Sequence, residues 1–138
     1  MIVRRRTGAA IQDVIPAVAR LRVAVFRDWP YLYDGDPDGA YGHAYLSALA
    51  NAGGGVVVTA EHEGRIVGAA TGQPLGTAHD YVRAPFRAQG LDIAARFYFG
   101  ESVLERELRG RGLARPAARP TRCPAAPSSK SATAASRA

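Results

Sequence analysis

A glycine loop set among arginines is the feature of this sequence that could do chemistry. The run R-G-R-G-L-A, residues 109–114, follows an apolar segment, 96–104, that is typical of a strand. Glycine lets backbone N–H groups converge on phosphate oxygens, and arginine adds positive charge. The run lacks the Lys-Ser/Thr pair of a Walker A loop and does not meet the dinucleotide-binding fingerprint. The run therefore predicts an anion-binding site, but one that is neither a Walker A loop nor a dinucleotide-binding loop.

A sheet must position this loop, and the chain before it predicts one. Residues 56–60 are a β-branched run that indicates a central strand, and a tight turn at Glu63-Gly64 leads into a second strand over 65–70, which makes a hairpin. Residues 2–6 predict an edge strand. Residues 73–95 hold two prolines and two glycines, so we expect a loop-rich insertion with one short helix before Gly90.

Two helices are expected between the first two strands. Apolar residues at steps of three and four predict a helix over 14–27, with Asp13 as its N-cap, Pro16 in its first turn and its end before Trp29-Pro30. The stripe consists of Ile11, Val14, Ile15, Val18, Leu21 and Val25. A second helix is expected over 40–50, with a buried face made of Tyr41, Tyr45, Leu46 and Leu49.

Preceded by this order of elements, the glycine loop resembles the signature Q/R-x-x-G-x-G/A of the GNAT family of acetyl-CoA-dependent N-acetyltransferases. Arg109, Gly112 and Ala114 occupy its three specified positions. The runs W-P-Y-L-Y-D-G at 29–35 and F-Y-F-G-E-S-V-L at 97–104 are also similar to a GNAT subgroup of unassigned substrate. The resemblance covers residues 1–114. It implies an α+β fold with a mixed, mainly antiparallel sheet and packed helices, and acetyl transfer from acetyl-CoA to a primary amine of a small molecule or peptide.

The resemblance also implies roles for individual residues. Glu101 is the carboxylate best placed to accept the ammonium proton, if its side chain faces the cleft, since a one-residue slip would turn it away. The pantetheine arm would bond the backbone of Ser102, Val103 and Leu104 like an added strand. The CoA pyrophosphate would lie on the backbone of Arg109, Gly110, Arg111, Gly112, Leu113 and Ala114. An acceptor pocket lined by Trp29, Tyr31 and Tyr33 is one interpretation of those aromatic residues, and ordinary packing is the other.

The resemblance stops at residue 114. Residues 115–138 hold five basic residues, no acid, four prolines and no Leu, Ile, Val, Met or aromatic residue, so we expect a disordered tail. A GNAT domain would continue with a helix, a splayed fifth strand and further elements. Their absence from this sequence, and the GC-rich composition of the tail, predict a truncated or frameshifted product that ends after the fourth strand. Such a sheet would expose an edge that invites self-association.

Composition limits the other classes of function. The net charge of +6 lies mostly in the tail, which lacks aromatic residues for stacking on bases, so nucleic acid is a disfavoured partner. The single cysteine, Cys123, excludes an internal disulfide and a cysteine-based zinc site. No apolar run is long enough to span a membrane and no secretory signal is present, so a cytoplasmic location is expected.

Two metal-site patterns are also disfavoured. Asp34, Asp36 and Asp38 match the opening of an EF-hand loop, but Tyr45 occupies the position of its required glutamate, so acidic turns are favoured. His43, His62 and His79 have no metal-ligand spacing, and structural or exposed roles are expected for them. The competing hypothesis for the whole chain is a non-catalytic GNAT remnant, or a small binding module with a basic tail.

Overall fold

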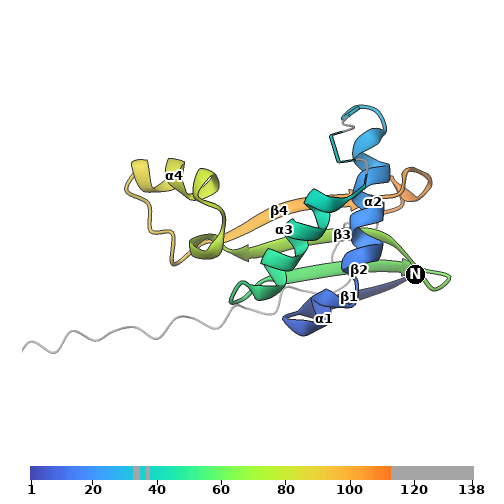
Figure 1. Cartoon of the computed structure of the whole chain (residues 1–138), viewed down its shortest axis with the longest axis horizontal. Helices are drawn as coiled ribbons and strands as arrows, with labels where there is room; N and C mark the ends of the chain where they lie inside the picture. Colours follow the sequence, from blue (N-terminus) through green and yellow to red (C-terminus); the bar gives the residue numbers. More distant parts are fainter. Residues whose placement is uncertain (33–34, 37, 113–138) are drawn as a thin grey trace, which may run out of the picture.

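The computed structural model describes residues 1–32, 35–36 and 38–112 (Figure 1). In chain order its elements are β1 (Ile2–Thr7), α1 (Ala9–Gln12), α2 (Ile15–Arg27), α3 (Ala40–Asn51), β2 (Val56–His62), β3 (Arg65–Pro74), the 3-10 helix η1 (Leu75–Thr77), α4 (Asp80–Ala88), β4 (Phe97–Leu104) and the 3-10 helix η2 (Arg106–Leu108). The predicted tail, 115–138, lies outside the described residues, as do Tyr33, Leu113 and Ala114.

The four strands form one sheet in the order β1-β2-β3-β4, and every described pair is antiparallel. The expected edge strand is confirmed as β1, and the β-branched run lies inside the sheet as β2. The parallel pairing that a mixed sheet requires does not occur among the described strands. Within that part of the chain β4 is the second edge of the sheet.

The predicted hairpin joins β2 to β3. Glu63 and Gly64 both have positive φ angles, 50° and 74°, which is the backbone that a two-residue turn of type I′ needs. β3 is longer than expected and reaches Pro74, because it continues to pair with β4 as far as Phe97.

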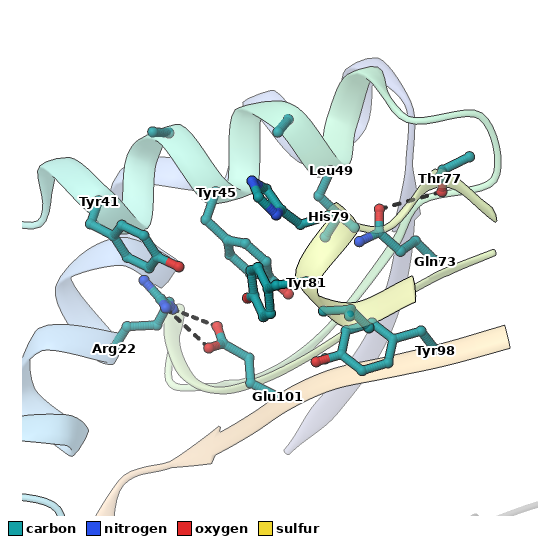
Figure 2. Close-up of a pocket in the computed structure, with 14 residues that line it drawn as sticks. Arg22, Tyr41, Tyr45, Leu49, Gln73, Thr77, His79, Tyr81, Tyr98 and Glu101 are labelled. Carbon is teal, nitrogen blue, oxygen red and sulfur yellow. Dashed lines mark hydrogen bonds and ion pairs between the residues drawn. The ribbon is translucent and has the colours of Figure 1, made fainter. Parts of the chain in front are cut away.

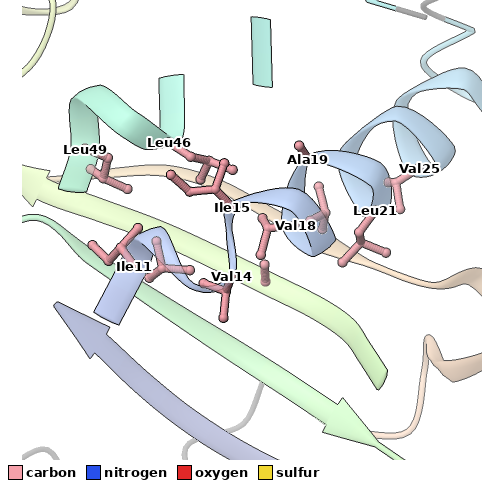
Figure 3. Close-up of a cluster of buried hydrophobic side chains, with 12 residues drawn as sticks. Ile11, Val14, Ile15, Val18, Ala19, Leu21, Val25, Leu46 and Leu49 are labelled. Atoms are coloured by element: carbon pink, nitrogen blue, oxygen red, sulfur yellow. The ribbon is translucent and has the colours of Figure 1, made fainter. Parts of the chain in front are cut away.

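The predicted apolar stripe forms the core between the helices and the sheet (Figure 3). All six of its residues are buried, but Ile11 lies on the separate short helix α1. The prediction of Asp13 as N-cap is wrong, because Asp13 ends α1 and Val14 precedes α2 without a side-chain cap. Pro16 lies in the first turn of α2, as predicted, and α2 ends before Trp29.

The helix predicted over 40–50 is confirmed as α3, which ends one residue later, at Asn51. The side chain of Asp36 binds its first turn. The two carboxylate oxygens of Asp36 accept the N–H groups of Tyr41 and Gly42, at 2.9 and 3.0 Å, which satisfies two unpaired donors of the first turn. Leu46 and Leu49 are buried as expected, whereas Tyr41 is 58% exposed, which corrects its assignment to the buried face. Tyr41 faces the cavity described below rather than the core.

The insertion between β3 and β4 contains η1 and the short helix α4, which lie beyond one end of the sheet (Figure 1). The N–H of Leu75 donates to the carbonyl of Arg96, and a guanidinium nitrogen of Arg83 donates to the carbonyl of Gly76, at 2.9 and 3.1 Å. Leu75 and Ala78 are buried. These contacts fix the start of α4 against the sheet.

Candidate functional site

A cavity of about 430 Å³ opens between α3, the β3–β4 edge of the sheet and the start of α4 (Figure 2). We call it the Glu101 cavity. The residues that line it and that the argument uses are Arg22, Tyr41, Tyr45, Gln73, His79, Tyr81, Tyr98 and Glu101. Of the residues that the sequence placed in a site, only Glu101 lies in this lining.

A β-bulge decides which way Glu101 points. Ala70 pairs with Ser102 and Gly72 pairs with Phe99, so Gly100 and Glu101 together oppose Thr71. The N–H of Glu101 donates to the hydroxyl of Thr71 at 3.2 Å. The extra residue puts Tyr98, Glu101 and Val103 on the face covered by the helices, although a regular strand would put Tyr98 and Val103 on opposite faces. The side chain of Glu101 therefore faces the cavity.

Glu101 is held by an arginine from α2. Nε and Nη2 of Arg22 donate to the two carboxylate oxygens of Glu101, the second at 3.1 Å, and the side chains are only 8% and 16% exposed. The guanidinium also lies 5.4, 5.8 and 5.2 Å from the ring centroids of Phe26, Tyr41 and Tyr45. The ion pair and the ring faces together stabilise the position of the guanidinium inside the fold.

Gly100 allows Tyr45 to approach the bulge. The Tyr45 hydroxyl lies 2.8 Å from the hydroxyl of Thr71, and a Cβ on Gly100 would overlap both oxygens. Burial raises the pKa of the Tyr45 phenol, and the hydrogen bond with Thr71 opposes that rise only in part. The phenol therefore stays protonated at neutral pH.

His79 and Tyr81 form the rim of the cavity at the start of α4. Their ring centroids are 4.8 Å apart, and Figure 2 shows both side chains reaching toward α3. His79 is exposed, which is one of the two roles that the sequence left open for it. Its carbonyl accepts the N–H groups of Val82 and Arg83, and its imidazole makes no hydrogen bond within the described part of the chain. Histidine is the side chain that most often serves as a general base, so this imidazole is a candidate for that role beside the carboxylate of Glu101.

The sequence reasoning missed most of this lining. The sequence does hold a signal for the burial of Arg22. This residue lies four positions after Val18 and three before Val25, on the buried stripe of α2. A charged residue at such a position indicates a buried partner. His79 and Tyr81 gave no such signal, because the insertion that carries them has no periodicity.

Two of the three aromatic residues predicted to line the acceptor pocket, Trp29 and Tyr31, are absent from the lining of the Glu101 cavity, and the third, Tyr33, lies outside the described residues. Trp29 is 72% exposed and does not line the Glu101 cavity. Tyr31 packs edge-to-face on Phe26, with ring centroids 5.4 Å apart, and lines a second cavity of about 370 Å³. Arg22 and Tyr41 separate the two cavities and line both.

The strand and loop assigned to CoA lie next to the cavity along the chain. Val103 is buried in the core, Ser102 is exposed, and the carbonyl of Leu104 accepts a hydrogen bond from Nε of Arg109 at 3.1 Å. Gly110 and Gly112 have φ angles of 73° and 74°, and Arg111 is exposed. Left-handed residues of this kind can turn successive N–H groups toward one anion, which fits a phosphate cradle.

Two other kinds of site are absent from the described residues. In that part of the chain, no three His, Cys, Asp or Glu side chains gather closely enough to hold a metal ion. Asp36 of the acidic run instead caps α3, and the hydrogen bond from the N–H of Tyr41 is the main cause that lowers its pKa. None of the described helices combines the length and the hydrophobicity that crossing a membrane requires.

Three solved structures are similar to this one. AAC(6')-Iy, solved in complex with the bisubstrate analogue CoA-S-monomethyl-acetylneamine, matches 82% of this chain and 63% of its own, with a TM-score of 0.53 and 18% identity. An aminoglycoside acetyltransferase, meta-AAC0020, from an uncultured soil metagenomic sample and bound to sisomicin, matches 80% of this chain and 60% of its own, with a TM-score of 0.48 and 19% identity. A third structure, of an acetyltransferase, matches 79% of this chain and 67% of its own, with a TM-score of 0.41 and 19% identity.

No protein-family model matches the sequence. No curated protein matches it either. The chain spans about 63% of the length of AAC(6')-Iy, and at 18% identity the likeness establishes the fold. The expectation of an α+β, GNAT-like fold is thereby confirmed.

Proposed function

We propose that this chain, which has the fold of the GNAT acetyltransferases, transfers an acetyl group from acetyl-CoA to a primary amine bound in the Glu101 cavity. One observation carries the proposal: Glu101 faces a cavity from β4, an edge strand in the described part of the chain, and only the short 3-10 helix η2 separates β4 from the glycine loop. One short segment thus supplies an amine-binding carboxylate, a free strand edge and an anion cradle. An acetyltransferase needs these three things side by side.

The glycine loop is the part that would hold the pyrophosphate. The backbone at Gly110 and Gly112 suits an anion, and Arg111, which is exposed, would add charge. Leu113 and Ala114 would complete the cradle. Ser102, Val103 and Leu104 would offer their backbone to the pantetheine arm, and Arg109 would then release the carbonyl of Leu104 and turn to the phosphates.

The acceptor amine would contact Glu101. Arg22 donates one hydrogen bond to each carboxylate oxygen of Glu101. Each oxygen keeps a further lone pair that could accept a hydrogen bond from an ammonium group in the cavity. The carboxylate of Glu101 already pairs with the guanidinium of Arg22, so the first role of Glu101 would be to hold and aim the amine. The alternative, that Glu101 itself takes the proton, is tested by the variants His79→Gln and Glu101→Gln in the Discussion.

His79 is the group we assign as proton acceptor. It lines the same cavity, its imidazole has no hydrogen-bond partner among the described residues, and histidine is the side chain most often used in general base catalysis. The ammonium gives one proton to the imidazole, the nitrogen lone pair forms the C–N bond to the thioester carbonyl, and the C–S bond breaks. The second amine proton leaves as the amide forms and the thiolate takes up a proton, so the products are an N-acetyl amine and CoA.

Calorimetric titration with acetyl-CoA tests the cofactor half of the proposal. We expect binding by the full chain and its loss in Gly112→Asp, which puts a negative charge and a side chain into the cradle at a left-handed residue. Equal binding by both proteins would remove the loop from the site. No binding by either would favour the rival hypothesis of a non-catalytic remnant or small binding module. A cytoplasmic location and self-association through the β4 edge remain predictions.

A further inference from the structure

Aromatic rings form much of the wall of the Glu101 cavity. Tyr41 and Tyr45 come from α3, Tyr81 from α4 and Tyr98 from β4. Figure 2 shows these rings around the carboxylate of Glu101. The apolar residues Ala44, Ala48 and Leu49 continue the wall along α3. Aromatic side chains pair favourably with another aromatic ring, in offset-stacked or edge-to-face arrangements, so a wall of this kind suits a ligand that carries a ring.

The charges of the lining favour a ligand with one ammonium group. Among the described residues that line the cavity, only Arg22, His79 and Glu101 can carry a charge near neutral pH. Arg22 already pairs with Glu101, so the lining offers one carboxylate and no excess of negative charge. A ligand with several ammonium groups would find no further carboxylate in the lining to pair with the others.

The rings around Glu101 already stabilise a cation. The guanidinium of Arg22 lies within 6 Å of the ring centroids of Tyr41 and Tyr45 while it pairs with Glu101. An ammonium on the cavity side of Glu101 would meet the same carboxylate and the phenol rings of the wall. The cavity, at about 430 Å³, is within the range that holds small-molecule ligands.

From these three observations we infer that the acceptor is an arylalkylamine, a single primary amine joined by a short alkyl chain to an aromatic ring. The amine lies on Glu101 and the ring lies among Tyr45, Tyr81 and Tyr98. The inference rests on the proposed function, because it names the substrate class of that same site. It sets this chain apart from the structurally similar AAC(6')-Iy, whose bound analogue carries an acetylneamine group.

Amine binding without acetyl-CoA tests this specificity separately from acetyl transfer. The full chain is titrated by calorimetry with 2-phenylethylamine, with propylamine, which lacks the ring, and with neamine, which carries several amines. We expect 2-phenylethylamine to bind at least about tenfold more tightly than propylamine, because the ring is stacked and buried. Neamine is expected to bind more weakly than 2-phenylethylamine.

Variants of the cavity wall test whether the amine binds in the Glu101 cavity. Tyr81→Leu changes a 68% exposed ring, so the fold should tolerate it, and it is expected to weaken 2-phenylethylamine binding several-fold while propylamine binding changes little. Tyr98→Leu is expected to do the same, and Tyr98→Phe to retain binding. Phe99→Leu is the matched control, because Phe99 is the next residue on β4, is 81% exposed and does not line the cavity.

The outcomes separate the two proposals. Ring-dependent binding that Tyr81→Leu and Tyr98→Leu weaken and Phe99→Leu leaves unchanged supports the inference, even if acetyl transfer then fails. Tighter binding of neamine, equal binding of propylamine, or no binding of any amine would overturn it. Acetylation of neamine in preference to 2-phenylethylamine would overturn it as well, and would leave the proposed acetyltransferase activity standing.

Discussion

Arg22 on α2 and Glu101 on β4, 79 positions apart in the chain, form a bidentate ion pair in the lining of the Glu101 cavity. The pair links the helical layer to the bulged edge strand. It fixes the position of the one carboxylate that the cavity offers, so the fold and the proposed chemistry depend on the same contact.

The first prediction concerns the stability that this pair provides. Arg22→Met leaves the carboxylate of Glu101 half-buried without its partner, so we expect the free energy of unfolding to fall by about 3 kcal/mol. Arg22→Met combined with Glu101→Gln removes the unpaired charge and should recover part of that loss. Urea unfolding followed by circular dichroism measures both, and additive losses in the double variant would show that the two residues are not coupled.

The second prediction concerns the bulge. Gly100→Ala would put a methyl group against the hydroxyls of Tyr45 and Thr71, so we expect a loss of about 1–3 kcal/mol in the free energy of unfolding. Gly53→Ala is the matched control, because no atom lies within 4 Å of a Cβ at that loop position. Thermal unfolding of both variants gives the comparison, and equal melting temperatures would contradict the tight contact at Gly100.

Much of the fold could be predicted from the sequence, because the signals were local. The stripe of α2, the Glu63-Gly64 turn and the β-branched run of β2 each depend on residues close together in the chain. The N-cap of α2 could not be predicted, because a separate short helix, α1, takes up Asp13. The start of α3 depended on Asp36, whose side chain reaches residues five and six positions away.

The candidate site was harder to predict, because its residues meet only through tertiary contacts. Glu101 was named from its strand, but its orientation depends on a bulge that shifts the alternation of β4 by one residue. The resemblance allowed Trp29 and Tyr31 to line an acceptor pocket, with ordinary packing as the alternative; Tyr31 packs on Phe26 and Trp29 lies exposed. His79 enters the cavity from an insertion whose path no local pattern reveals.

The third prediction concerns the acid sensitivity of α3. Hydrogen bonds from the N–H groups of Tyr41 and Gly42 hold the pKa of Asp36 below the ordinary aspartate value. A lowered pKa in the folded state contributes stability above the ordinary value of about 3.9 and loses it as the pH falls through the lowered pKa. Asp36→Asn should therefore lose less unfolding free energy between pH 6 and pH 3 than the unmodified chain does. Equal losses would contradict the capping role.

The fourth prediction separates His79 from Glu101 in the proposed reaction. If the imidazole of His79 takes the amine proton, His79→Gln lowers kcat and leaves KM for the amine nearly unchanged. Glu101→Gln is expected mainly to raise KM for the amine, because it removes a binding charge. An unchanged kcat in His79→Gln, with kcat lowered in Glu101→Gln, would return the role of base to Glu101.

Detection of the N-acetylated amine by mass spectrometry is the most direct test of the central claim. The claim is that the Glu101 cavity holds the amine that accepts the acetyl group from acetyl-CoA. The purified full chain is incubated with acetyl-CoA and a panel of primary amines, with Gly112→Asp and Glu101→Gln in parallel. We predict an N-acetyl product with the unmodified chain, little product with Glu101→Gln and none with Gly112→Asp. Absence of product from every amine, or equal product from all three proteins, would contradict the claim.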